Sequence, residues 1–305
     1  MTFVSSPQSR LLVVLAGLLV LTAVIYELRT LPGRSFGAPT SKTAETTPHK
    51  EPTANQSACP PLPRRSNRIP TTWIASYPGS GATVTRQLLE ATTGYIADDY
   101  HAPTRCLKHN VITCKTHWPF LQYNFTYPQS QTPSMLLFRN PLWAIPSYYN
   151  WLWERDHHVA YHTQQASVGD WILWRDAHFS ENLDGWKSYF QAWTKVDQYI
   201  CYEDLFQSEN TGPHVLTNVL QVLSNITQQR WNNNTACLWR SVVLDQHKAK
   251  RPKHYRPRFT REQLEQLEQA VRDVAVQVPA VASEMRAYEE AIREAEEDGE
   301  EENGE

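Results

Sequence analysis

The fold of this chain is decided by residues 72–89, which read TWIASYPGSGATVTRQLL. Residues 72–77 are rich in strand-forming side chains, and the Pro-Gly-Ser-Gly turn at 78–81 ends that run. Apolar residues then recur at helical spacing through Leu89. The stretch predicts a strand, a tight glycine loop and a helix, an arrangement whose loop amides and helix N-terminus can hold an anion.

Three further runs of strand-forming residues follow at 111–116, 134–138 and 198–202. The middle one, SMLLF, is apolar throughout, which is typical of a strand covered on both faces of a parallel sheet. Thr260 and Gln263 form a capping-box pattern that predicts the start of a C-terminal helix. The chain is therefore expected to be an α/β protein with an open, mostly parallel sheet flanked by helices. Ligands of such sheets bind at the carboxyl ends of the strands.

The glycine loop does not match the G-x-x-x-x-G-K-[ST] motif of ATPases and GTPases. Thr85 lies six positions after Gly79, and the loop contains no lysine, so an ordinary nucleoside triphosphatase is disfavoured. Further along, Arg139 ends the run at 134–138, and Ser147 follows eight residues later. An arginine at a strand end can hold a phosphate through two hydrogen bonds, and a serine on the next helix can donate from the same side. Taken alone, these features also fit an ordinary turn and a surface arginine.

Composition limits the possible classes of protein. Hydrophobic residues make up 41% of the 305, and eleven residues are Trp, which supplies a substantial core and excludes a wholly disordered chain. The formal net charge of −3 and the isoelectric point near 6.4 disfavour a general nucleic-acid binder, which usually carries a basic surplus. Any site for a polyanion must therefore be a local basic pocket.

The N-terminal segment indicates a protein of the secretory pathway. Residues 11–26, LLVVLAGLLVLTAVIY, carry no charge and follow Arg10. A cleaved signal peptide, an uncleaved transmembrane signal anchor and a buried helix are the alternatives, and the buried helix is disfavoured because the proline-rich stretch that follows offers nothing to pack on. The anchor is favoured because residues 27–31 offer no small-residue cleavage site. The positive-inside rule then weakly favours residues 1–10 in the cytoplasm and the bulk of a single-pass type II protein in the lumen.

The remaining chain divides into three expected parts. Residues 27–70 hold eight of the twenty prolines and predict a disordered stem. Residues 71–290 are expected to form one folded domain. Residues 291–305 are expected to form an acidic tail, either the end of a helix or a solvated segment.

Five cysteines and four N-glycosylation sequons bear on the compartment. The cysteines make no C-x-x-C pair, so a structural zinc site is not expected, and in a lumen up to two disulfides can form with one thiol left over. Their pairing cannot be read from the sequence, and Cys114 and Cys201 fit equally well as buried thiols within strands. The cysteines are Cys59, Cys106, Cys114, Cys201 and Cys237, and the sequons begin at Asn55, Asn124, Asn225 and Asn233.

Four short motifs, taken together, resemble the sulfotransferase family. They are Ser-Tyr-Pro-x-Ser-Gly from residue 76, Lys-Thr-His-x-Pro at 115–119, Arg-Asn-Pro-x5-Ser at 139–147 and Tyr-Glu-Asp-Leu at 202–205, in the family's order. The resemblance implies the P-loop-like sulfotransferase fold and transfer of a sulfuryl group from 3′-phosphoadenosine-5′-phosphosulfate (PAPS). The loop is most similar to the branch of sulfotransferases that contains WSC domains, although the cysteine-rich WSC domain itself is missing.

The resemblance also implies a role for each matching position. His117 matches the family's catalytic base, and Lys115 matches the lysine that steadies the transferring sulfuryl group. Arg139 and Ser147 match the pair that binds the 3′-phosphate of the donor, and Tyr202 matches a residue near the adenine. The loop that would cradle the 5′-phosphosulfate consists of Pro78, Gly79, Ser80, Gly81, Ala82 and Thr83.

Two positions depart from the family pattern. Gly79 stands where the family usually has Lys or Arg, and Val84 stands where an aromatic residue usually stacks on the adenine. Arg86, one turn into the helix, is a candidate to supply the missing charge. Lys250 and Arg251 lie where the family closes a loop over the 3′-phosphate, and they are candidates for that contact although the family's Arg-Lys-Gly pattern is absent.

The expected function is that of a membrane-anchored sulfotransferase of the Golgi or another secretory compartment, acting on a glycan, glycolipid or protein. In-line transfer relies on positioning, positive charge and a general base, so no metal is expected. Two alternatives stay open. One is a weakened or inactive sulfotransferase-fold binding protein, which Gly79 and Val84 motivate. The other is a P-loop kinase, which the absent loop lysine disfavours. No nucleic-acid partner is expected.

Overall fold

The computed structural model of the chain describes residues 59, 62–99, 106, 110–121, 133–206, 208–231, 234–247 and 258–302. The expected cytoplasmic tail, signal anchor and most of the stem lie outside these ranges. Within the ranges, no helix is both long enough and apolar enough to cross a bilayer.

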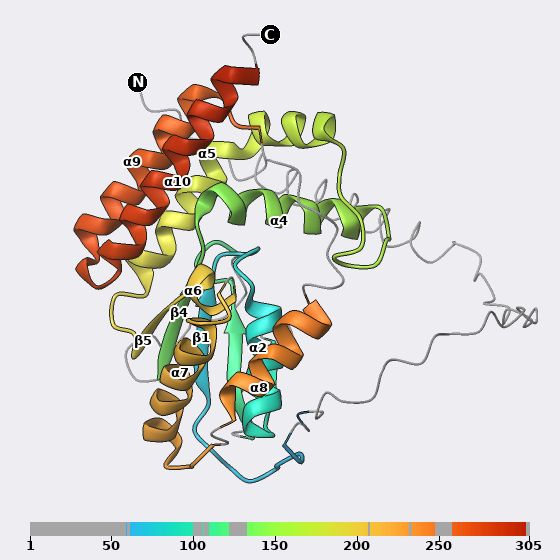
Figure 1. The fold of residues 1–305 in the computed structure, drawn as a ribbon, viewed down its shortest axis with the longest axis vertical. Helices are drawn as coiled ribbons and strands as arrows, with labels where there is room; N and C mark the ends of the chain where they lie inside the picture. The colour runs from blue at the N-terminus through green and yellow to red at the C-terminus, as the bar shows by residue number, and fades with distance from the viewer. Residues whose placement is uncertain are drawn as a thin grey trace, which may run out of the picture. The chain divides into compact units, whose positions relative to one another are not determined.

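A five-stranded sheet lies at the centre of the domain, and each pair of neighbouring strands is parallel (Figure 1). The order β2-β3-β1-β4-β5 confirms the expected α/β architecture and is consistent with a P-loop-like fold. Four strands match the predicted runs, whereas β2, with the sequence IADD, was not predicted because it is short and half polar. The strands are β1 (Thr72–Ser76), β2 (Ile96–Asp99), β3 (Val111–Thr116), β4 (Ser134–Phe138) and β5 (Gln198–Cys201).

Helices connect the strands and cover both faces of the sheet. The long helices that follow β1 and β4 begin after short loops at the carboxyl ends of those strands, so their N-termini lie at the edge where ligands bind in such folds. The helices are α2 (Ala82–Thr93), α4 (Pro141–Asp156), α5 (Val168–Ala192), α6 (Tyr202–Phe206), α7 (Gly212–Thr227), α8 (Thr235–Trp239), a π-helix (Arg240–His247), α9 (Arg261–Gln277), a short 3-10 turn (Pro279–Val281) and α10 (Ala282–Glu302).

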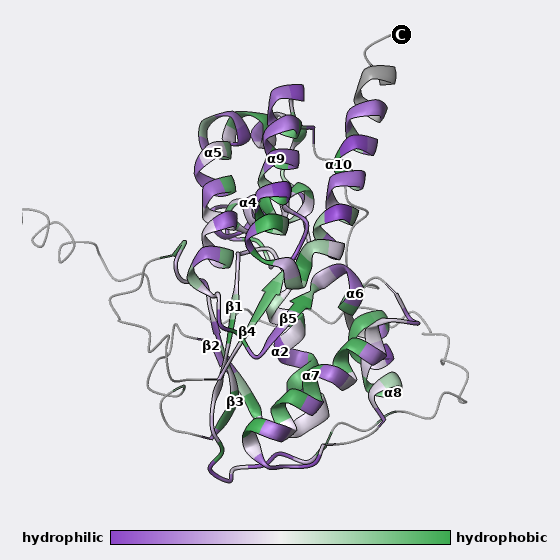
Figure 2. Ribbon diagram, turned by 90° about the vertical axis from the view of Figure 1, so that its left-hand side faces the viewer, coloured by the Kyte–Doolittle hydropathy of each residue, from purple (hydrophilic) through white to green (hydrophobic). Residues whose placement is uncertain are grey.

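Alternation along the strands divides the apolar side chains into two cores. Trp73, Ala75 and Phe138 face the core formed with α4, α5, α9 and α10. Ile74 and Met135 face the opposite core, formed with α2, α7 and α8. Figure 2 shows the strands largely hydrophobic and the outer helices α9 and α10 largely hydrophilic. The domain is therefore a three-layer sandwich, as expected for a parallel sheet whose strands are apolar on both faces.

The C-terminal helices α9 and α10 form an antiparallel hairpin (Figure 1). The capping box predicted at Thr260 and Gln263 is confirmed, since the Thr260 hydroxyl accepts from the Gln263 amide and the Gln263 side chain accepts from the Thr260 amide. The helix α10 continues through Glu302 and therefore includes most of the expected acidic tail.

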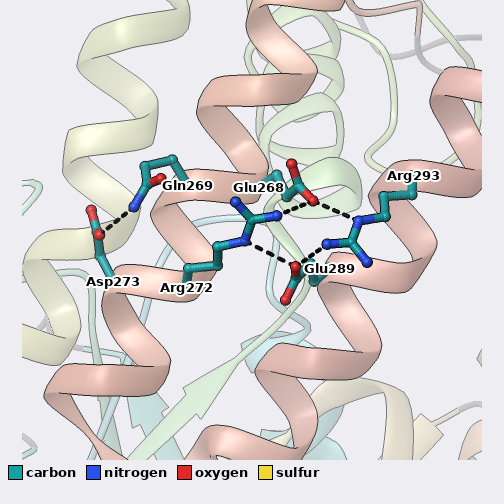
Figure 3. Close-up of polar contacts among 6 residues, drawn as sticks. All are labelled: Glu268, Gln269, Arg272, Asp273, Glu289 and Arg293. Atoms are coloured by element: carbon teal, nitrogen blue, oxygen red, sulfur yellow. Dashed lines mark hydrogen bonds and ion pairs between the residues drawn. The ribbon is translucent and has the colours of Figure 1, made fainter.

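Four charged side chains link the two helices of this hairpin on its outer surface (Figure 3). The Arg272 guanidinium contacts Glu268 at 2.5 Å and Glu289 at 2.9 Å, and Arg293 contacts the same two carboxylates, Glu268 at 2.6 Å. Each arginine thus bridges α9 and α10. Because the arginines are about half exposed, a single pair contributes little, and the network acts mainly by fixing the alignment of the helices.

The folded domain begins earlier than residue 71, which corrects the expected stem boundary. The Leu62 amide donates to the Ala91 carbonyl at 3.2 Å, and the Arg65 amide donates to the Gly94 carbonyl at 2.8 Å. Ile69 is buried in the core. Residues 62–70 therefore pack along α2, although their prolines and polar residues are typical of a linker.

Two disulfides link segments that the sequence could not pair. Cys59 is bonded to Cys237, which ties the start of the domain to α8 across 178 residues of chain, and Cys106 is bonded to Cys114 in β3. Cys201 is a buried free thiol at the end of β5. Of the two cysteines that fitted equally well as thiols, Cys114 is therefore paired and Cys201 is not.

Candidate functional site

The glycine loop lies at the point where the order of the strands reverses. Strand β1 is central, and the chain visits β2 and β3 on one side of it before crossing to β4 on the other. Ligands of open α/β sheets bind at such a switch point. Gly79 and Gly81 have φ angles of 84° and 87°, in the left-handed region that favours glycine. They turn the chain from β1 into α2, whose N-cap makes no side-chain hydrogen bond.

The Ser80 hydroxyl is the clearest polar group in this loop without a partner. Ser80 is 1% exposed, and its Oγ has no hydrogen-bond partner within the described part of the chain. Buried hydroxyls are normally satisfied. An unsatisfied hydroxyl beside the open N-terminus of a twelve-residue helix is suited to an anion that is bound from solvent.

Gly79 is required by packing as well as by its φ angle. A Cβ atom at this position would lie 2.4 Å from the Ala144 carbonyl oxygen and 2.9 Å from the Tyr148 amide nitrogen. Helix α4 therefore contacts the loop backbone directly, and no side chain fits between them. The position at which the sulfotransferase motif usually has Lys or Arg therefore has no room for a side chain in this fold. Ser147, on the same turn of α4, lies beside the loop as well.

Arg139, at the end of β4, points toward the glycine loop. Its Nη1 donates to the Gly79 carbonyl oxygen at 2.8 Å, and its guanidinium lies 4.3 Å from the centre of the Tyr202 ring. The Trp186 indole donates to the Arg139 carbonyl at 2.9 Å. Arg139 is only 7% exposed, its Nε has no partner, and it makes no ion pair within the described ranges. A buried, preoriented guanidinium with unused donors is suited to hold an anion.

His117, just beyond β3, contacts Ser76, the last residue of β1 before the glycine loop. Its Nδ1 lies 2.6 Å from the Ser76 carbonyl oxygen, and its own carbonyl accepts from the Tyr189 hydroxyl at 2.5 Å. A carbonyl can only accept, so this contact assigns the proton to Nδ1 and leaves Nε2 as the basic nitrogen of the neutral ring. The imidazole is thereby oriented in the tautomer that a general base needs.

Lys115 and Arg86 share one carboxylate at the neighbouring strand end. Lys115 Nζ lies 2.8 Å from Asp99 Oδ2, and Arg86 Nη1 lies 3.6 Å from the same oxygen. Arg86 Nε also donates to the Ala97 carbonyl at 3.0 Å. Arg86 is therefore held toward β2, and the extra positive charge it was expected to bring is partly offset by Asp99.

Of the other predicted site residues, some lie at the glycine loop and others do not. Tyr202 lies beneath the loop, since its ring would be 2.5 Å from a Cβ at Gly81, and it also contacts the guanidinium of Arg139. Val84 is 1% exposed and belongs to the core beneath α2, so it offers no ring for stacking. Pro78 and Ala82 are buried, and Thr83 is exposed. The predicted candidates Lys250 and Arg251 lie outside the described residues.

Sequence reasoning missed three residues that orient the site. Asp99 was missed because β2 was not predicted. Trp186 and Tyr189 lie three positions apart on α5, so they face the same side of that helix, and they donate to the carbonyls of Arg139 and His117. Their spacing was visible in the sequence, but a buried Trp and Tyr are ordinarily core residues, so their bonding partners could not be inferred.

None of the known family models matches this chain, and no curated protein is significantly similar to it in sequence. The fold and the site define an α/β protein, consistent with a P-loop-like fold, with a glycine loop and basic side chains at the carboxyl end of a parallel sheet.

Proposed function

We propose that this protein is a sulfotransferase that moves a sulfuryl group from PAPS to a hydroxyl or amine of a glycan, glycolipid or protein acceptor. One observation carries the proposal. His117 and Arg139, which come from two different strand ends, both bond to backbone carbonyls of the β1 end and its loop, at Ser76 and Gly79. The motifs that resemble the family are thus close to one loop rather than scattered.

In the proposed reaction the loop amides and the α2 N-terminus hold the 5′-phosphosulfate, and the Ser80 hydroxyl donates to it. Arg139 and Ser147 bind the 3′-phosphate, the group that distinguishes the donor from ATP. Within the described residues, Ser80 Oγ and Arg139 Nε are buried without hydrogen-bond partners, and a bound anionic group would supply the partner that each lacks.

His117 is proposed as the general base and Lys115 as the electrostatic stabiliser. Nε2 of His117 takes the proton of the acceptor hydroxyl as its oxygen attacks sulfur, and the bond between sulfur and the bridging oxygen of the donor breaks. The leaving group is adenosine 3′,5′-bisphosphate. Lys115 offsets the charge that develops on the sulfuryl oxygens, for which it must exchange at least part of its contact with Asp99.

A secretory location supports the choice of acceptor. Two disulfides, Cys59–Cys237 and Cys106–Cys114, are typical of proteins in oxidising compartments. Together with the apolar segment at 11–26 and the sequons, they favour a Golgi-type membrane protein with its folded domain in the lumen. Acceptors there are glycoconjugates and proteins rather than cytosolic small molecules.

A second candidate function is a nucleotide-binding protein without transferase activity. It is favoured by the ion pair of Lys115 with Asp99 and by the absence of a basic side chain at position 79. In such a protein the donor would bind and no sulfuryl group would move.

The two candidates are separated by measuring donor binding and transfer on the same full-length chain. Calorimetry with PAPS, adenosine 3′,5′-bisphosphate and ATP tests the pocket, and transfer of ³⁵S from labelled PAPS to a panel of glycan and peptide acceptors tests the reaction. Tight bisphosphate binding with transfer supports the enzyme, and binding without transfer to any acceptor supports the second candidate. A preference for ATP would reject both and favour a kinase.

A further inference from the structure

We propose that Tyr288, on the C-terminal helix α10, is a positioning residue for the donor site: its hydroxyl fixes Glu203, and Glu203 holds the backbone that carries Arg139. The inference rests on the proposed function, because it concerns the 3′-phosphate contact of Arg139. Tyr288 lies 149 positions beyond Arg139 in the chain, and no motif of the resemblance includes it.

The link consists of two hydrogen bonds to opposite oxygens of one carboxylate. The Tyr288 hydroxyl donates to Glu203 Oε2 at 2.6 Å. The Asn140 amide donates to Glu203 Oε1 at 3.2 Å. Glu203 therefore connects α10 with the peptide that immediately follows Arg139.

A small movement of the Asn140 backbone would also move the guanidinium of Arg139. Asn140 is the N-cap of α4, and its side chain accepts from the Leu142 amide. In the sheet register Phe138 pairs with Cys201, so the next residues of the two strands, Arg139 and Tyr202, are also neighbours. Tyr202 precedes Glu203 and supplies the ring beneath the guanidinium. Glu203 is thus connected to Arg139 in two ways: through Tyr202, which precedes Glu203 in the chain, and through Asn140, which follows Arg139.

The phenol of Tyr288 is a permanent donor in this arrangement. Burial, followed by the charge of Glu203, raises the pKa of Tyr288 well above its ordinary value, so the hydroxyl keeps its proton at physiological pH. The Cys201 thiol contacts the same hydroxyl at 3.3 Å and donates to Glu203 Oε2 at 3.5 Å. A thiol is a weak donor, so this bond replaces a lost phenol bond only in part. Removing the hydroxyl therefore leaves Glu203 Oε2 with the weak Cys201 donor alone and loosens the hold on the carboxylate.

Helix α10 is itself held firmly enough to act as an anchor. Met285, Tyr288 and Ile292 are buried along one face of it. On the outer side Glu289, the residue after Tyr288, is bound by Arg272 and Arg293 (Figure 3). Both sides of the helix turn that carries the phenol are thus fixed, and the position of the hydroxyl relative to Glu203 is set by the hairpin.

The test compares two nucleotides on the full-length chain by calorimetry. Adenosine 3′,5′-bisphosphate has the 3′-phosphate, and adenosine 5′-monophosphate lacks it. Tyr288→Phe is expected to weaken binding of the bisphosphate about five- to tenfold, less than the loss of a direct hydrogen bond to a charged group because the effect is indirect, and to leave binding of the monophosphate unchanged. A merely structural defect would weaken both nucleotides together. In a Glu203→Gln background, which keeps the size of the side chain and removes one carboxylate oxygen, Tyr288→Phe should have a smaller effect, because the two act through one link.

Tyr95→Phe is the matched control. Tyr95 is also buried, but its hydroxyl has no partner within the described residues, and it lies in the opposite core. It should change neither affinity. If the wild-type chain bound both nucleotides equally, the proposed function would fail, and this inference with it. If the wild type discriminated and Tyr288→Phe, with an unchanged melting temperature, discriminated equally well, the link through Glu203 alone would be rejected.

Discussion

The ammonium group of Lys115 lies 2.8 Å from the carboxylate of Asp99, so the lysine of the Lys-Thr-His motif is ion-paired with the end of strand β2. Arg86 approaches the same oxygen at 3.6 Å. The side chains of Lys115 and Asp99 are 12% and 21% exposed, which limits screening by solvent. Asp99 therefore determines how much of the positive charge at this strand end is available to a bound anion.

Neutralising Asp99 should strengthen anion binding. Asp99→Asn removes the charge that competes for Lys115 and Arg86, and we expect adenosine 3′,5′-bisphosphate to bind about two- to fivefold more tightly at low salt, with a smaller gain at high salt. Calorimetry at two ionic strengths measures both. Asp273→Asn makes the same change of charge on the exposed surface of α9 and serves as control. An equal gain in both variants would show a general charge effect and exclude a local one.

Replacing His117 should stop transfer of the sulfuryl group from the proposed donor and leave the affinity for that donor unchanged. His117→Ala removes the proposed base, and His117→Asn keeps an N–H close to the position of Nδ1 that can still donate to the Ser76 carbonyl. Both variants are expected to lose at least about 100-fold in turnover, while donor affinity in His117→Asn stays within about twofold. Single-turnover ³⁵S transfer and calorimetry provide the two readouts. Intact turnover in His117→Asn would place the base elsewhere.

Removing Arg139 should weaken the binding of nucleotides that carry a 3′-phosphate more than that of nucleotides that lack it. Arg139→Ala takes away a buried cation, and we expect a loss of about 2–3 kcal/mol in binding of adenosine 3′,5′-bisphosphate. The loss should be much smaller for adenosine 5′-phosphosulfate, which lacks the 3′-phosphate. Equal losses for the two nucleotides would reject the assignment of Arg139 to that phosphate. Arg139→Lys keeps the charge without the planar guanidinium, so its affinity for adenosine 3′,5′-bisphosphate should lie between those of the wild type and Arg139→Ala.

Gly79 should not tolerate any side chain. Gly79→Ala places a Cβ 2.4 Å from the Ala144 carbonyl at a φ of 84°, and we expect the free energy of unfolding to fall by about 2 kcal/mol or more. Gly79→Lys, which would introduce the residue usual in the sulfotransferase motif, should cost at least as much. Gly169→Ala is the matched control, because its Cβ has no neighbour closer than 3.8 Å and it lies in the first turn of α5. Urea denaturation compares them, and equal midpoints would contradict the packing argument.

The buried thiol of Cys201 should make stability fall at alkaline pH. Burial, followed by the charge of Glu203, raises the pKa of Cys201 far above its ordinary value. In the unfolded chain the thiol loses its proton near pH 8.5, whereas the folded chain keeps it. The free energy of unfolding is therefore unaffected below that pH and decreases above it, by up to about 1.4 kcal/mol per pH unit. Urea denaturation between pH 7.5 and 10 should show a shallower decline in Cys201→Ala, and identical slopes would refute this origin.

Local features of this protein could be predicted with good accuracy from local sequence. The strand, loop and helix at 72–89 follow from propensity and spacing, and the Thr260 capping box follows from two side chains three residues apart. Such features depend on neighbours within one turn or one strand, so no other part of the chain can change them easily. Strand β2 was not predicted because its four residues, half of them acidic, are too few to show an alternating or apolar strand pattern.

The site depended on contacts between distant segments. The sequence identified His117, Arg139 and Lys115 as candidates, but it could not show that Ser76 and Gly79 accept from the first two or that Asp99 pairs with the third. It also left the disulfide pairing open and placed the domain boundary too late.

The amino-acid sequence by itself therefore determined the α/β class, the glycine loop and the residue types available to it. Only the tertiary structure decided which of them meet, because strand order and helix packing bring together residues that are dozens of positions apart. The backbone of α4 against Gly79 is the clearest case: a glycine that reads as a missing cation in the chain is, in the fold, the only residue that fits.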